Sequence, residues 1–192
     1  EKGSLYMQRV YNGLDRIIEL NPEIIKVYDE LFTDSRFHFD QRKFEKTIDD
    51  IAQHKTETSR FKSSHIYLGM TPPIYQELGF ERLPVMATAL HIKSAMLEVS
   101  ENPNIHPHNI SAEVLKQIPE AIKKPIAILQ SATVPEDIVS IVSLKDKKGQ
   151  LILIPFSANK KGFFNSFKID INLAKSIYGK DTLTNFLKRA FK

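Results

Sequence analysis

The stretch DIVSIVSLKDKKGQLILIPF, residues 137–156, decides the fold. Two apolar runs rich in Val and Ile, 137–144 and 150–156, flank the polar segment KDKKG at 145–149. Short runs of β-branched residues are typical of strands, and a polar connection that ends in glycine is typical of a hairpin loop. The stretch therefore predicts an antiparallel β-hairpin.

Further strands are predicted on both sides of this hairpin. PIAILQS precedes it at 125–131, and SFKIDI follows it at 166–171 with Phe167, Ile169 and Ile171 alternating with polar neighbours. Helical patterns fill most of the rest: 5–20, a second helix up to Phe32, 40–54, 83–99, 111–124 with a kink or a break caused by Pro119, and a closing helix at 181–191. HIYLG at 65–69 is expected to form one short early strand. The predicted fold class is α+β, with N-terminal helices, a four-stranded antiparallel sheet and a C-terminal helix.

Composition and charge indicate a soluble globular protein with two unlike parts. The 192 residues are 42% hydrophobic and 26% charged, without an apolar run long enough to span a membrane. Residues 1–60 carry a net charge of −2 and residues 61–192 a net charge of +6. We expect 1–60 to be a helical segment or linker and 61–192 to be the functional domain. The basic part suggests a polyanionic partner, although a lysine-rich solvated surface explains the charge as well.

Three of the six histidines lie between residues 91 and 108. On a helical wheel of 83–99, His91 falls opposite the apolar face, as a solvated histidine would, and Lys93 falls within the apolar arc. Lys93 could extend its stem along the core edge or face a phosphate site. His106 and His108 lie just before a predicted helix N-terminus, which is a setting suited to anion binding.

Several kinds of chemistry find no support in the sequence. Cysteine is absent, which excludes disulfides, thiolate catalysis and cysteine zinc sites. The pair His106 and His108 lacks an evident third ligand, so no metal site and no cofactor are predicted. Glycine-rich phosphate loops and the G-x-S-x-G motif do not occur. The acidic pairs at 49–50 and 136–137 are expected to be exposed, which leaves histidine chemistry.

Four segments, taken in order and spacing, resemble one family. They are HIYLGMTPPIYQELGFERLPVMATALHIK (65–93), HNISAEVLKQIPEAIKKPIAILQS (108–131), DIVSIVSLKDKKGQLILIPFSAN (137–159) and FKIDINLAKSIYGKD (167–181). Together they resemble the C-terminal toxin domain of phage MuF-type head proteins and bacterial polymorphic toxins. That domain is grouped with the barnase–EndoU–colicin–RelE-like ribonucleases, and the resemblance covers roughly residues 61–192.

The resemblance implies a set of site residues. The family's first histidine falls on His91, and its histidine before the following helix falls on His108. The closing family pattern and a family serine after the first sheet strand fall on Ile169, Asp170, Asn172, Ser176, Tyr178, Gly179 and Ser131. Leu90 stands where the family often has a basic residue, so a cation would have to come from elsewhere, such as Lys93. The expected catalytic residues are His108, His91, Ser176 and Tyr178, and the expected substrate-binding residues are Lys93, Asn172, Lys175 and Ser131.

The resemblance also implies an activity. A metal-independent endoribonuclease would use one group to take the proton from a 2′-OH and another to protonate the departing 5′-oxygen, and histidine can do either. The expected partners are RNA, with tRNA and mRNA as candidates, and a cognate immunity protein. The expected place of action is the bacterial cytoplasm, after delivery by a secretion system or a phage particle. The alternative is a module that binds nucleic acid or protein without catalysis.

Overall fold

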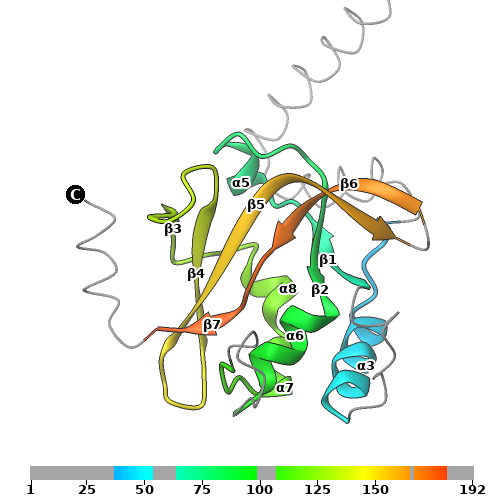
Figure 1. Cartoon of the computed structure of the whole chain (residues 1–192), viewed down its shortest axis with the longest axis vertical. Helices are drawn as coiled ribbons and strands as arrows, with labels where there is room; N and C mark the ends of the chain where they lie inside the picture. The colour runs from blue at the N-terminus through cyan, green and yellow to red at the C-terminus, as the bar shows by residue number, and fades with distance from the viewer. Residues whose placement is uncertain (1–36, 54–63, 99–106, 165–166, 181–192) are drawn as a thin grey trace, which may run out of the picture. The chain divides into compact units, whose positions relative to one another are not determined.

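The computed structural model describes residues 37–53, 64–98, 107–164 and 167–180 (Figure 1). The chain divides into two compact units, Glu1–His38 and Phe39–Lys192, and all elements below belong to the second. The helices expected at 5–20 and up to Phe32, and the closing helix expected at 181–191, lie outside the described residues.

A seven-stranded mixed sheet forms the centre of this unit (Figure 1). Its order is β1-β2-β6-β5-β4-β3, and β7 pairs with β5. Neighbouring strands are antiparallel except β2 and β6, which run parallel. The strands are β1 (His65–Met70), β2 (Pro84–Thr88), β3 (Ala127–Gln130), β4 (Ile138–Lys145), β5 (Leu151–Phe164), β6 (Phe167–Ala174) and β7 (Tyr178–Gly179).

The hairpin at 137–156 is confirmed as β4 and β5, but the predicted four-stranded antiparallel sheet is wrong. Residues 84–88, expected in a helix, form β2 in the interior of the sheet. Pro84, Val85, Met86 and Ala87 are all buried, so this strand has no polar alternation. A short apolar run of this kind has the same pattern whether it becomes a buried strand or a buried helix. The segment could therefore not be assigned from periodicity.

Five helices are described: α3 (Gln41–Ala52), α5 (Pro73–Gln76), α6 (Ala89–Met96), α7 (Ala112–Leu115) and α8 (Ile118–Ala121). Side-chain oxygens of Asp40, Thr88 and Ser111 accept hydrogen bonds from backbone N–H groups at the starts of α3, α6 and α7. The predicted disruption of the 111–124 helix is confirmed, because the segment is divided into α7 and α8, and Pro119 lies in the first turn of α8. The predicted helix 83–99 survives only as α6.

The main hydrophobic core lies between the helices and one face of the sheet. Its buried members include Ile48, Ile92, Leu115, Ile118, Ile152 and Ile154, which come from α3, α6, α7, α8 and β5. Alternate residues of the hairpin point to the opposite face, where Val139, Ile141 and Leu153 form a smaller buried cluster. Both faces of β4 and β5 are thus covered, which explains their nearly continuous apolar runs.

Asn172 links the parallel strand pair to the neighbouring loops. It is 1% exposed, and its Nδ2 donates hydrogen bonds to Thr71 Oγ1 (2.8 Å) and the Glu81 carbonyl (2.9 Å). Its Oδ1 accepts from the Asn159 backbone N–H at 3.1 Å. The side chain expected to bind substrate therefore holds the β1–β2 connection and a bulge of β5 against β6.

We expect Asn172→Ala to lower the free energy of unfolding by about 2–3 kcal/mol, because it leaves buried polar groups without hydrogen bonds. Urea denaturation measures this change. Gln117→Ala, which removes an exposed amide, is the control and should change stability by less than about 0.5 kcal/mol. Equal effects of the two substitutions would contradict a structural role for Asn172.

Candidate functional site

The carboxyl ends of β2 and β6 lie together because the two strands are parallel, with Ala87 paired to Ala174. After β2 the chain enters α6, whose first turn carries His91. The His91 ring is partly buried and hydrogen-bonds the backbone carbonyl of Ala174. Its Nδ1 is buried and has no hydrogen-bond partner among the described residues. His91 is therefore tied to the end of β6 and holds one unused nitrogen.

His108 lies beside the C-terminal half of the same helix. Its backbone N–H donates to the Ser94 carbonyl at 3.3 Å, and the Ile110 N–H donates to the Ala95 carbonyl at 2.8 Å. The His108 ring packs on Tyr178, with 5.6 Å between ring centroids and 38° between planes. The loop before α7 thus brings His108 against β7.

The segment Ala174–Tyr178 connects these two contacts. Lys175 N–H still donates to the Pro155 carbonyl at 2.9 Å, and pairing resumes at Tyr178 opposite Leu153. The strand gains one residue relative to β5 here, so the segment forms a bulge. Ile177 is fully buried, and Ser176 is partly exposed.

Both histidines therefore contact one five-residue segment, His91 at its start and His108 at its end. Four residue steps of extended chain span at most roughly 14 Å. Along α6, His91 lies one helical turn, a rise of roughly 5 Å, before Ser94, whose carbonyl accepts the hydrogen bond from the His108 N–H. The helix α6 and the bulge thus confine His91, His108 and Tyr178 to one region, with Ser176 on the connecting chain.

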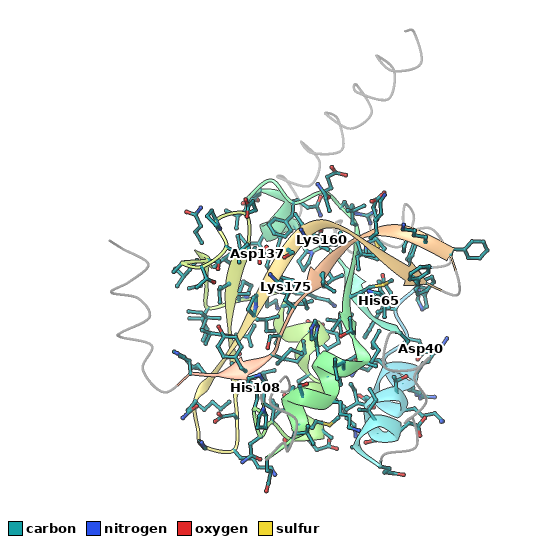
Figure 2. The ribbon with its side chains drawn as sticks, viewed as in Figure 1. Asp40, His65, His108, Asp137, Lys160 and Lys175 are labelled. Carbon is teal, nitrogen blue, oxygen red and sulfur yellow. The ribbon has the colours of Figure 1, made fainter. Side chains whose placement is uncertain are left out.

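Lys175 is fixed at this bulge by a buried carboxylate. Its Nζ lies 2.7 Å from Asp137 Oδ2, and Asp137, which is 4% exposed, also accepts a hydrogen bond from the Ser157 hydroxyl. Figure 2 shows Asp137, Lys160 and Lys175 near one another at the central strands, and His108 farther away, beside β7. The expectation that Asp137 is exposed was wrong.

The charge states follow from these surroundings. Burial lowers the pKa of His91; the hydrogen bond to Ala174 opposes this, and the positive charges of His65 and Lys175 add to the lowering. Burial likewise lowers the pKa of His65. Burial raises the pKa of Asp137, but hydrogen bonds from Lys175 and Ser157 and the charges of Lys175 and Lys160 outweigh it, so the pKa lies below the usual value. At neutral pH, His91 is neutral and Asp137 is ionised.

The remaining predicted residues lie elsewhere. Lys93 is two residues after His91 in α6, so the two side chains project roughly 200° apart and flank the buried stripe on opposite sides. Ser131 closes a turn, because its Oγ accepts from the Val134 N–H at 3.2 Å. The Asn172 side chain makes the hydrogen bonds to Thr71, Glu81 and Asn159 described above. His106 lies outside the described residues.

Sequence reasoning missed two residues of this region, Asp137 and His65. Asp137 directly precedes a strand, and nothing in its sequence neighbourhood distinguishes a buried carboxylate from an exposed turn residue. His65 begins β1 and pairs with Thr88, the cap of α6. That pairing depends on β2, which the sequence did not reveal.

A hollow of about 730 Å³ lies between α3, α7, α8 and β4, and none of the candidate site residues lines it. Within the described ranges, no three His, Asp or Glu side chains come together as metal ligands would. Nor does any helix in this part of the chain have the length and apolarity to cross a membrane.

Comparison with known proteins bears on the C-terminal half. Residues 99–192 match the family model of the phage MuF C-terminal domain. No curated protein and no solved structure matches the chain significantly. The matched range contains His108, Lys175, Ser176 and Tyr178, whereas His91 and His65 precede it. A MuF C-terminal domain is thus indicated for residues 99–192, and the resemblance seen for 61–98 stays a prediction.

We expect Lys175→Met to lower the free energy of unfolding by about 2 kcal/mol. Breaking a fully buried ion pair costs about 3–5 kcal/mol, and the cost is smaller here because the Lys175 side chain is 39% exposed. Lys123→Met is the matched control, since its partner Glu120 is exposed and the pair should contribute less than about 0.5 kcal/mol. If urea denaturation shows similar losses of unfolding free energy for the two variants, the ion pair of Lys175 with Asp137 does not stabilise the fold.

The free energy of unfolding should fall as the pH drops from 7 to 5.5. The unfolded chain then takes up protons at His65 and His91 before the folded chain does, because both pKa values are lowered by folding. His91→Asn should reduce this slope, and His38→Asn, at an exposed position, is the control. An unchanged slope in His91→Asn would contradict the lowered pKa.

Proposed function

We propose that this chain carries a toxin domain that cleaves RNA without a metal ion, by attack of a 2′-OH on the adjacent phosphate. One observation carries the proposal: His91 and His108 contact opposite ends of the segment Ala174–Tyr178, which also holds Lys175 and Tyr178. Two histidines, a cation and a phenol in one region are the groups that such a reaction needs. The match to the phage MuF C-terminal domain agrees with this assignment but does not extend to activity.

His108 takes the leading acid–base role in this proposal. It is partly exposed, and its ring lies against Tyr178, whose hydroxyl could donate to a phosphate oxygen. His91 is neutral at neutral pH, which is the form that accepts a proton. Its unpartnered Nδ1 is buried, so RNA would reach this atom only by displacing the side chains that cover it.

Lys175 and Tyr178 would stabilise the negative charge that develops on the phosphate. Lys175 is held by Asp137 but remains 39% exposed, so one side of its ammonium group can face a phosphate. Prepositioned donors of this kind stabilise a transition state without reorganisation during the reaction. The proposed setting is the bacterial cytoplasm, where an immunity protein would protect the producing cell.

His108→Ala should reduce the rate of RNA cleavage by at least ~10²-fold while the protein stays folded, the usual effect of removing a general acid or base. His91→Ala should reduce it by a similar factor, and Tyr178→Phe by a smaller one. The assay follows purified protein on single-stranded RNA with EDTA present, and DNA of the same sequence should stay intact because it lacks the 2′-OH.

His38→Ala provides the matched control, since His38 is exposed and outside the compact unit that begins at Phe39. Induced expression of the wild-type chain should arrest bacterial growth, and His108→Ala should not. RNA that stays intact after long incubation with the wild-type protein, combined with salt-sensitive RNA binding, would replace this proposal with the non-catalytic binding module.

A further inference from the structure

A two-stranded arm extends from the sheet next to the candidate site. It consists of residues 160–164 of β5 and 167–171 of β6, paired from Lys160–Ile171 to Phe164–Phe167. The described pairing of β4 with β5 ends at Phe156, and that of β2 with β6 begins at Asn172. The arm therefore projects beyond its neighbours in the sheet, as Figure 1 shows.

The arm combines exposed aromatic rings with positive charge. Phe163 is 54% exposed and Phe167 is 64% exposed, and three lysines of the arm are exposed as well: Lys160, Lys161 and Lys168. The arm has one acidic residue, Asp170, which pairs with Lys161. Rings that accept stacked bases, together with cations that contact phosphates, are the usual means of binding single-stranded nucleic acid.

The register separates the two phenylalanines. Phe163 lies opposite Lys168, and residues opposite each other in an antiparallel pair share a face. Phe167 lies opposite Phe164 on the other face, where the Phe164 ring packs against Tyr67 with 5.8 Å between centroids. Phe163 and Lys168 thus form one aromatic and cationic face of the arm.

This face is connected to the histidine region through His65. The Phe163 N–H donates to His65 Nδ1 at 3.4 Å, and the two rings lie 6.4 Å apart. His65 pairs with Thr88, which caps the helix that carries His91. Figure 2 shows His65 beneath the arm. A strand of RNA bound at the histidines could therefore continue past His65 onto Phe163.

We infer that Phe163, Lys168 and His65 form a subsite for a nucleotide beside the cleaved bond of single-stranded RNA, with the base stacked on Phe163 and a phosphate near Lys168. This inference rests on the proposed function for the identity of its ligand. The contribution of one stacked base corresponds to roughly 5- to 150-fold in affinity.

Binding of a fluorescent single-stranded 2′-O-methyl RNA to the full chain, followed by anisotropy, tests the subsite. This probe cannot be cleaved because its 2′-oxygens are blocked, so binding is measured apart from catalysis. Phe163→Ala should raise Kd by at least ~5-fold. Phe167→Ala is the matched control, since it removes a more exposed ring from the opposite face of the same arm, and it should change Kd by less than about 2-fold.

Lys168→Gln should reduce the slope of log Kd against log salt by roughly 0.7, the value for one phosphate contact on a single strand. Lys123→Gln, at an exposed lysine after α8, should leave the slope unchanged. Equal Kd values for Phe163→Ala and the wild-type protein would overturn the subsite. So would a loss of self-association or of protein partner binding in Phe163→Ala with RNA affinity unchanged.

The failures of the two proposals can be told apart. If the wild-type protein cleaves RNA but Phe163→Ala binds the probe normally, the subsite is wrong and the proposed activity stands. If the wild-type protein leaves RNA intact but Phe163→Ala raises Kd and Lys168→Gln lowers the salt slope as described, Phe163 and Lys168 bind single-stranded RNA and the catalytic proposal is wrong.

Discussion

The parallel pairing of β2 with β6 is the constraint on which the rest of the structure depends. It joins segments separated by three strands in the sequence, and Asn172 holds it in place by bonding Thr71, the Glu81 carbonyl and the Asn159 N–H. Because parallel strands end at the same edge, this pairing puts the start of α6 beside the end of β6. An antiparallel pairing would send these two ends to opposite edges of the sheet.

The bulge that follows β6 is the second feature that determines the arrangement of the histidine region. A regular strand from Ala174 to Tyr178 would stay in one register along β5, whereas the extra residue shifts Tyr178 relative to Leu153. Ile177 anchors the bulge in the core, and Lys175 is held from the other side by Asp137. Bulges often redirect a side chain at a functional site. Here the bulge brings Tyr178 to the His108 ring while the preceding residues stay at His91.

The features of the fold that could be predicted from the sequence are those determined by residues close together in the chain. The β4–β5 hairpin and the disruption of the 111–124 helix by Pro119 follow from residues close in sequence, and the sequence indicated both correctly. The strand β2 was not predicted because its apolar run continues without a break into the first turn of α6. Without β2, neither the mixed sheet nor the place of His65 could be foreseen. The burial of Asp137 depends on Ser157 and Lys175, both distant in sequence.

The arrangement of Lys175 and His91 favours an anionic ligand in this region. The net charge of the sequence does not reveal this arrangement. The buried Asp137 carboxylate orients Lys175 but satisfies only one side of its ammonium group. The pKa of His91 is low chiefly because the ring is buried, and the charges of His65 and Lys175 lower it further. A phosphate beside His91 would counter the repulsion from the Lys175 ammonium group and raise that pKa. Under the proposed function, RNA itself would therefore bring His91 closer to the pKa at which a group can both accept and return a proton near neutral pH.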